Sequence, residues 1–215
     1  MRKEIFEEDN FYHIYNRGVD KRLIFKTDRD RIRFINSFRL LNNFSFIPSH
    51  FDFITFEPVN FLKPIEPYVE VAAGCLMDNH FHFLLTPLRY GGISTLLHKL
   101  GTSYTMYFNK LNERTGRLFE GTFKAKHVDR DEYASYLTQY IHLNPLDIFQ
   151  AKPRQEALEE VEKYQWSTLP DFIGKESRLS VLLPQKNKIK FRNDILGIDH
   201  EQYKKIFYEL YEGLA

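Results

Sequence analysis

Two apolar runs joined by a two-residue turn restrict the fold of this chain more than any other feature. Residues 68–77 read YVEVAAGCLM and residues 80–87 read HFHFLLTP, and only Asp78 and Asn79 separate them. Both runs are rich in residues typical of strands, and adjacent Asp and Asn favour tight turns. The sequence therefore predicts a β-hairpin, which supplies the second and third strands of the fold.

The segments on either side of the hairpin supply two more strands and two helices. Residues 11–18 predict a strand that leads into a turn, and residues 28–42 have the apolar spacing and acidic first turn of an amphipathic helix. After the hairpin, residues 93–111 predict a second long helix, and residues 117–128 predict a fourth strand that bends at Gly121. The order β-α-β-β-α-β predicts an α+β fold with a ferredoxin-like antiparallel sheet and its helices on one face.

A third helix follows this unit, and the character of the chain then changes. Residues 129–144 predict a helix that opens with acidic residues and is ended by Pro145. We expect residues 1–146 to form one domain and residues 147–215 to form a mostly helical appendage. The insert at about 44–67 contains four prolines and is predicted to be a variable loop.

The composition allows one sizeable core, because 43% of the 215 residues are hydrophobic. The 30 Lys and Arg residues nearly balance the 29 Asp and Glu residues, which argues against a polybasic tail that coats nucleic acid. The sequence shows no signal-peptide core and no window near the roughly 18 apolar residues of a membrane span, so we expect a cytoplasmic protein without membrane contacts. The single cysteine, Cys75, lies among apolar residues and is expected to be a core thiol.

The near-neutral total hides a basic middle of the chain. Between residues 89 and 126, Glu113 and Glu120 are outnumbered by seven basic residues: Arg89, Lys99, Lys110, Arg114, Arg117, Lys124 and Lys126. Together with Arg17, Lys21 and Arg22 after the first strand, these side chains predict a groove for a phosphate backbone, with Phe119 or Phe123 stacking on unpaired bases. The alternative is a set of solvated surface charges and core aromatics.

Two histidines lie within the apolar run of the hairpin. Because side chains alternate along a strand, His80 and His82 share one face with Leu84 and can converge on one metal ion. This spacing alone is weak evidence, and the alternative is a pair of hydrogen-bonded surface histidines. His127 and His142 are expected to be structural.

The predicted third helix carries a tyrosine and an asparagine about one helical turn apart. Tyr140 and Asn144 are four residues apart, so both side chains project from one helical face. A hydroxyl nucleophile, an amide oxygen and two imidazoles suit Mg²⁺ or Mn²⁺ acting on a phosphate ester. The alternative is an aromatic core stripe, because Tyr133, Tyr136 and Tyr140 have the spacing that such a stripe also uses.

Four segments together resemble the HUH single-tyrosine transposases, the family of the insertion-sequence-200-like and REP-associated tyrosine transposases. These segments read HIYNRG, CLMDNHFHFLLTP, LFEGTFKAKHV and YIHLNPL, and they span about residues 11–146. The later YQWSTL resembles the Trp-Ser segment that follows the catalytic domain in many members. The chain departs from the family pattern at Thr122, where many members carry arginine, and in the insert 44–67.

The resemblance implies an enzyme that nicks and rejoins single-stranded DNA at hairpin or repeat sequences. It implies that His80 and His82 are metal ligands, that Asn144 is the third ligand, and that residues 1–146 form the catalytic domain. It implies that Tyr140 is the nucleophile, that the intermediate is a 5'-phosphotyrosine, and that Mg²⁺ or Mn²⁺ is needed but no nucleotide cofactor. It also implies DNA contacts from Arg17, Lys21, Arg22, Arg117, Lys124 and Lys126, in a monomer or homodimer.

Two other readings remain open from the sequence. The first is a catalytically silent or host-retained protein that binds single-stranded DNA hairpins with the same fold. The second is an unrelated metal hydrolase, which would be indifferent to Tyr140→Phe. The short segment 129–131 before the third helix favours a tyrosine helix that serves its own chain.

Overall fold

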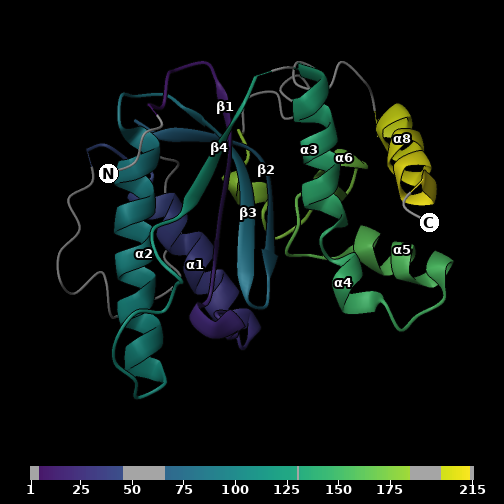
Figure 1. The fold of residues 1–215 in the computed structure, drawn as a ribbon. Coiled ribbons are helices and arrows are strands. Elements are labelled where there is room, and N and C mark those ends of the chain that lie inside the picture. The colour runs from purple at the N-terminus through teal and green to yellow at the C-terminus, as the bar shows by residue number, and fades with distance from the viewer. Residues whose placement is uncertain (1–4, 46–65, 130, 185–199, 214–215) are drawn as a thin grey trace.

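A computed structural model of the chain describes residues 5–45, 66–129, 131–184 and 200–213. Four antiparallel strands form one sheet in the order β2-β3-β1-β4 (Figure 1). The strands are β1 (Phe11–Arg17), β2 (Val69–Met77), β3 (His80–Pro87) and β4 (Lys124–Val128). This order is that of the ferredoxin-like split βαβ unit, so the predicted fold class is confirmed.

Helices cover both faces of the sheet. Helices α1 (Asp28–Leu41) and α2 (Gly92–Leu111) make the β-α-β connections and lie together on one face, as predicted (Figure 1). Helix α3 (Asp131–Leu143) follows β4 and packs on the opposite face, chiefly against β2. The sheet thus separates two cores, one under α1 and α2 and one under α3.

The alternation of β3 decides which side chains meet which helix. Phe81 and Phe83 are buried in the core under α1 and α2. Leu84 is buried in the core under α3, so the side of β3 that carries His80 and His82 faces the third helix. The expected division of the two strand faces is therefore confirmed.

Local sequence signals fix the first helix. Thr27 caps α1 through a reciprocal capping box, in which its hydroxyl accepts from the Asp30 backbone N–H. The Asp30 carboxylate in turn accepts from the Thr27 backbone N–H at 2.9 Å. These bonds satisfy backbone donors that the first helical turn leaves free, and α1 therefore begins at Asp28.

The fourth strand is shorter than the sequence predicts. Tyr15 of β1 is paired with Lys124, but Gly18, three residues later, is paired with Phe119, five residues earlier. Two extra residues therefore bulge out around Gly121, whose carbonyl accepts from the Asn16 side chain at 3.1 Å. The predicted bend at Gly121 is confirmed, but regular strand structure covers only Lys124–Val128. Before the bend, pairing with the end of β1 continues through two backbone bonds of 2.9 Å, from the Glu120 N–H to the Arg17 carbonyl and from the Val19 N–H to the Leu118 carbonyl.

The segment after Pro145 folds back on the sheet. It contains α4 (Leu146–Phe149), α5 (Arg154–Lys163), α6 (Leu169–Phe172), the 3-10 turn η2 (Ser180–Leu182) and α8 (His200–Gly213). Another 3-10 turn, η1 (Val19–Lys21), lies near the other end of the chain and follows β1. The Leu76 N–H donates to the carbonyl of Trp166 at 2.8 Å, and Cys75 and Ser167 form an isolated bridge along the edge of β2. Trp166 is also part of the core under α1 and α2. The division at residue 146 remains a prediction.

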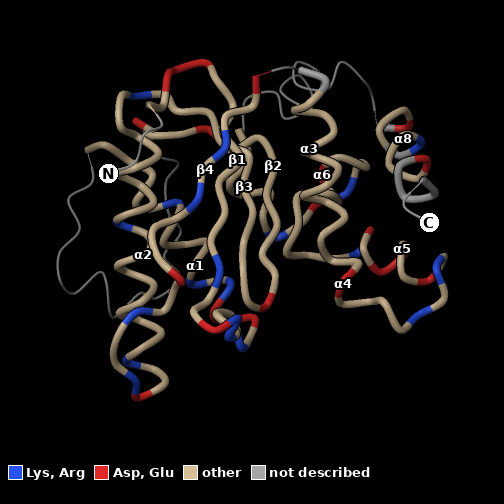
Figure 2. Tube along the Cα trace, in the orientation of Figure 1, with Lys and Arg blue, Asp and Glu red and all other residues tan. Residues whose placement is uncertain are grey.

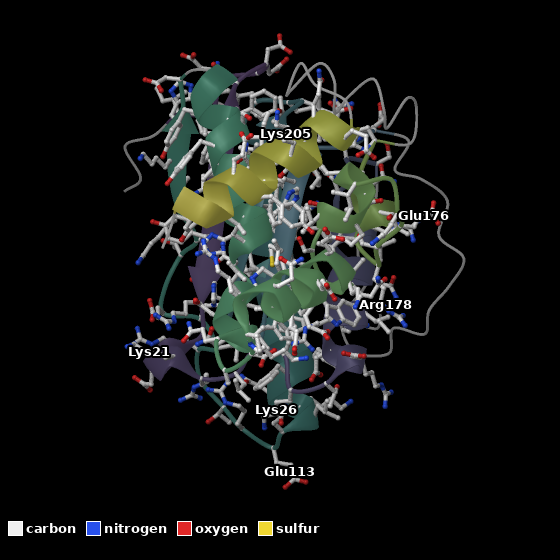
Figure 3. The ribbon with its side chains drawn as sticks, turned by 90° about the vertical axis from the view of Figure 1, so that its right-hand side faces the viewer. Lys21, Lys26, Glu113, Glu176, Arg178 and Lys205 are labelled. Atoms are coloured by element: carbon white, nitrogen blue, oxygen red, sulfur yellow. The ribbon has the colours of Figure 1, made fainter. Side chains whose placement is uncertain are left out.

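Helix α8 is attached to α3 through a buried histidine. His142 is fully buried, and its Nδ1 and Nε2 lie 2.6 Å from the Tyr203 hydroxyl and 2.8 Å from the Thr168 hydroxyl. Figure 3 views the molecule from this side, where α8 carries Lys205. His142 is structural, as predicted, and Cys75 is a fully buried thiol, as predicted.

Within the described ranges, no helix has the length and apolar character needed to cross a membrane. The insert 44–67 lies largely outside the described residues.

Candidate active site

One pocket of about 330 Å³ collects most of the side chains singled out in the sequence. It lies between the sheet and α3, with a contribution from the start of α4. Its lining residues are Tyr15, Asn16, Arg17, His80, His82, Glu120, Lys124, Tyr140, Asn144 and Asp147. The predicted nucleophile, the three predicted metal ligands and two predicted DNA contacts thus lie around one cavity of a single chain.

The two central strands place the histidines. In the antiparallel register of β1 and β3, Tyr15 lies opposite His82 and Arg17 lies opposite His80. Paired residues share a face of the sheet, so Tyr15 and Arg17 point toward α3 together with the histidines. The ring of Tyr15 stacks on that of His82 at 5.6 Å and 18°.

His82 has a buried partner on β1. Its Nδ1 lies 2.8 Å from Nε2 of His13, and the two residues are only 7% and 8% exposed. Burial lowers the pKa of both imidazoles, so each is neutral at pH 7 and only one nitrogen of this contact carries a proton. When His82 is the donor, its Nε2 keeps a free lone pair, which is the form that binds a metal.

His80 is oriented by asparagines on both sides. Its Nδ1 lies 2.6 Å from Oδ1 of Asn79, an oxygen that only accepts, so Nδ1 carries the proton and Nε2 does not. Burial lowers the pKa of His80 and keeps this neutral form. Nε2 lies 3.4 Å from Oδ1 of Asn144, whose amide nitrogen donates to the Tyr140 carbonyl at 2.9 Å. Two lone-pair atoms therefore face each other across a short gap, which suits a cation between them.

These donors fit a divalent metal. His80 and Asn144 contribute a nitrogen and an oxygen to the same gap, and His82 lies beside His80 with ring centroids 5.1 Å apart. The neighbours Asn79 and His13 hold the other ring nitrogens, as is usual for histidine ligands. No group of three His, Cys, Asp or Glu side chains in the described parts of the chain has a metal-binding arrangement; the predicted set of ligands consists of two imidazoles and one amide.

Tyr140 projects from α3 over the histidines. It is 45% exposed, and its ring stands at 90° to that of His82 with centroids 5.9 Å apart. Burial raises the pKa of the phenol, and the charge of Asp147 and the neighbouring Tyr136 and Tyr15 raise it further. The hydroxyl is therefore protonated at neutral pH and must lose its proton to act as a nucleophile.

The predicted DNA contacts divide into two groups. Arg17 and Lys124 line the pocket, and Lys126 lies next to it on β4, where Figure 2 shows a run of basic residues. The other three are not among the pocket residues: Arg117 lines a separate cavity of about 460 Å³ beside α2, Arg22 pairs with Asp20, and Lys21 lies in η1, where its carbonyl accepts from the Asn79 side chain at 3.2 Å (Figure 3).

The basic middle of the sequence is not one surface. Arg89 pairs with Glu66 at 3.5 Å, and Lys99 donates to the Tyr68 hydroxyl at 3.2 Å, both beside the start of β2. Phe119 is 7% exposed and belongs to the core, but together with Phe123 and Arg117 it lines the cavity beside α2. The basic residues counted together in the sequence are thus carried by different elements, and the DNA groove stays a prediction.

Six pocket or support residues were not among the predicted site residues: His13, Tyr15, Asn16, Asn79, Glu120 and Asp147. The signal for His13 and Tyr15 was their alternation along the first strand, which places them on one face. His127 lies on the exposed side of β4, 3.2 Å from the Asn10 side chain, and is not among the pocket residues.

The sheet and the pocket define a class of protein. It is a ferredoxin-like domain in which a central strand presents a His-x-His pair to a tyrosine and an asparagine one helical turn apart. Residues 66–144 match a family model described as "Transposase IS200 like". The resemblance found in the sequence is confirmed over this segment, which contains His80, His82, Tyr140 and Asn144.

A solved structure has the same fold. It is described as a REP-associated tyrosine transposase bound to a REP hairpin, with a TM-score of 0.50 and 13% identity over 86% of this chain and 87% of the other. At this identity the likeness supports the fold alone. No curated protein matches the chain.

Proposed function

We propose that this protein is a metal-dependent transesterase that nicks and rejoins single-stranded DNA at hairpin or repeat sequences. The observation that carries the proposal is the convergence of Tyr140, His80, His82 and Asn144 on one pocket. The transposase family match supports the reaction class. The hairpin in the description of the similar structure supports a folded single strand as substrate.

The residues divide the work in the following way. The Tyr140 oxygen attacks the phosphorus of a DNA phosphodiester and forms a new O–P bond, while the bond to the 3' oxygen breaks. The phosphate keeps its bond to the 5' oxygen of the downstream fragment, so this fragment stays attached to the tyrosine. The departing oxygen takes up a proton and becomes the 3' hydroxyl of the upstream fragment. Because one phosphate ester replaces another, the reaction is reversible and needs no nucleotide cofactor.

Other groups of the pocket would bind the negative phosphate and accept the proton of the tyrosine. Arg17 and Lys124 are the cations that line the pocket and would hold the phosphate. A Mg²⁺ or Mn²⁺ ion held by His80, His82 and Asn144 would withdraw charge from the nonbridging oxygens. The raised pKa of Tyr140 means that its hydroxyl needs a base to remove the proton. Glu120 and Asp147 are the carboxylates that line the pocket and could accept it.

The test is the formation of a covalent adduct. Purified protein is incubated with Mg²⁺ or Mn²⁺ and a pool of 3'-labelled single-stranded hairpins, because the fragment that stays on the tyrosine is the one that carries the 3' end of the DNA. The products are separated by denaturing electrophoresis. We expect a labelled protein band that disappears with EDTA and in Tyr140→Phe. The matched control is Tyr90→Phe, because Tyr90 is 89% exposed and does not line the pocket. A band of equal intensity in Tyr140→Phe would refute the assigned nucleophile.

A second candidate is a protein of the same fold that binds DNA hairpins without cutting them. The observation in its favour is that the surroundings of Tyr140 raise the pKa of the phenol and so oppose ionisation. This candidate predicts measurable hairpin binding with no adduct for any metal or oligonucleotide in the pool.

A further inference from the structure

Two tyrosines of α3, Tyr133 and Tyr136, lie beside the pocket and have no role in the proposed chemistry. Tyr136 is 50% exposed, so the spacing of tyrosines in this helix does not mark a core stripe. Instead Ala134, Leu137 and Ile141 face the sheet. The ring of Tyr133 packs partly against that core and stacks on Tyr136, with centroids 6.3 Å apart at 22°. Tyr136 therefore has a supported ring with an open side.

Lysines from β4 lie next to these rings. Lys126 donates to the Tyr133 hydroxyl at 2.8 Å, and its ammonium group lies 4.9 Å from the centre of that ring. Lys124 lies 5.8 Å from the centre of the Tyr15 ring and lines the pocket. Both lysines are exposed on an edge strand, and the exposed carboxylate near Lys126 is that of Asp129. Each lysine of β4 thus lies against one aromatic ring, Lys126 against Tyr133 and Lys124 against Tyr15.

We propose that Tyr136, supported by Tyr133, is a stacking platform for unpaired bases of the DNA strand that enters the pocket, and that Lys126, which is bonded to Tyr133, and Lys124, which lines the pocket, hold the phosphates of that strand. Proteins that hold single strands combine aromatic faces, on which bases stack, with cations that follow the phosphates. A duplex hides its base faces, so the platform selects unpaired over paired DNA. The inference rests on the proposed function for the identity of the ligand.

The geometry limits the platform to the immediate neighbourhood of the cleaved bond. Tyr136 precedes Tyr140 by one helical turn, which is about 6 Å along the axis. One strand of DNA rises about 3.4 Å for each nucleotide when stacked. The base on Tyr136 therefore belongs to a nucleotide within about two positions of the scissile phosphate.

The test measures binding with cleavage removed. In a Tyr140→Phe background, fluorescence anisotropy gives the Kd of a hairpin with a single-stranded extension and of the same hairpin without it. Losing one base stack costs about 1–3 kcal/mol, so we expect Tyr136→Ser to weaken binding of the extended hairpin by about 5- to 150-fold. Tyr136→Phe keeps the ring and should restore the affinity, while the blunt hairpin should bind all three proteins alike.

Two further variants separate stacking from charge and from folding. Tyr90→Ser makes the same exchange at an exposed site away from the platform and should leave both Kd values unchanged. Lys126→Gln should weaken the extended hairpin and reduce the salt dependence of its binding by about one released ion for the lost contact. Because Tyr136 is half exposed, its replacement opens no core cavity, and thermal melting checks that each variant is folded.

The outcomes distinguish this inference from the proposed function. Unchanged affinity of Tyr136→Ser for the extended hairpin overturns the platform, even when wild-type protein forms the tyrosine adduct. An equal loss for extended and blunt hairpins also overturns it, because stacking on unpaired bases would affect only the former. Absence of an adduct together with a selective loss in Tyr136→Ser leaves the platform standing and overturns the cleavage reaction.

Discussion

Replacing His13 with phenylalanine should weaken the proposed metal binding, although His13 is not one of the three proposed ligands. His13 lies on β1, and its Nε2 is 2.8 Å from Nδ1 of His82. Phenylalanine keeps a flat ring in the space beside Tyr15 but offers no acceptor to the imidazole. His82 then loses the bond that holds its Nδ1 proton and leaves Nε2 free for the ion.

The magnitude follows from the burial of the pair. Both histidines are less than a tenth exposed, so water does not readily replace the lost partner. Removing the outer partner of a histidine ligand usually lowers metal affinity about 10- to 100-fold, which corresponds to about 1.4–2.8 kcal/mol. Titration of Mn²⁺, followed by electron paramagnetic resonance or calorimetry, should show this increase in Kd for His13→Phe.

Two comparisons make the result decisive. His127→Phe changes an exposed histidine on β4 that contacts Asn10, and it should bind Mn²⁺ like the wild type. His82→Phe removes a ligand and should bind more weakly than His13→Phe. Equal Mn²⁺ affinity of His13→Phe and wild type, with weak binding by His82→Phe, would refute the role assigned to the His13 contact.

Three further predictions follow from contacts in and around α3 and at the start of α1. Asn144→Ala removes the amide oxygen that faces His80, and since losing a ligand costs no less than losing an outer partner, it should raise the Kd for Mn²⁺ more than about tenfold while the melting temperature changes little. A Kd within twofold of wild type would exclude Asn144 as a ligand. Burial lowers the pKa of His142 to about 3. Between about pH 6.5 and this value His142 is protonated in the unfolded chain but not in the folded chain, so the free energy of unfolding falls by about 1.4 kcal/mol per pH unit. Urea unfolding in EDTA should therefore show that the free energy of unfolding falls from pH 7 to pH 5 by roughly 2 kcal/mol more in wild type than in His142→Gln. An equal decrease in the two proteins would contradict a neutral buried imidazole. Thr27→Ala removes the hydroxyl of the capping box and should lower the unfolding free energy by about 1 kcal/mol, with Ser in its place restoring most of it; an unchanged urea midpoint for Thr27→Ala would show that the cap contributes nothing.

The parts of the site that follow from local periodicity were predictable. The common face of His80 and His82 follows from the alternation of a strand, and the common direction of Tyr140 and Asn144 follows from the helical repeat. That these two faces meet follows from the element order, because a helix that leaves the edge strand β4 has only the free face of the sheet to cover.

The parts that depend on long-range contacts were not predictable. Alternation places His13 on the same strand face as Tyr15, but nothing in the sequence pairs it with His82, which lies 69 residues away. The late start of β4 goes with a two-residue shift in its pairing with β1, which local propensity does not encode. Likewise, the separation of Lys99 from Lys124 depends on the different elements that carry them.

The contact between Tyr203 and His142 has a consequence for the newly made protein. During synthesis the helix that carries Tyr140 emerges from the ribosome before α8, because 61 residues separate His142 from Tyr203. Thr168 and Phe172 can contact His142 earlier, but the cluster that joins Leu143 to Tyr203 and Phe207 needs α8. Every side chain of the pocket has therefore been synthesised before the last support of this helix is available.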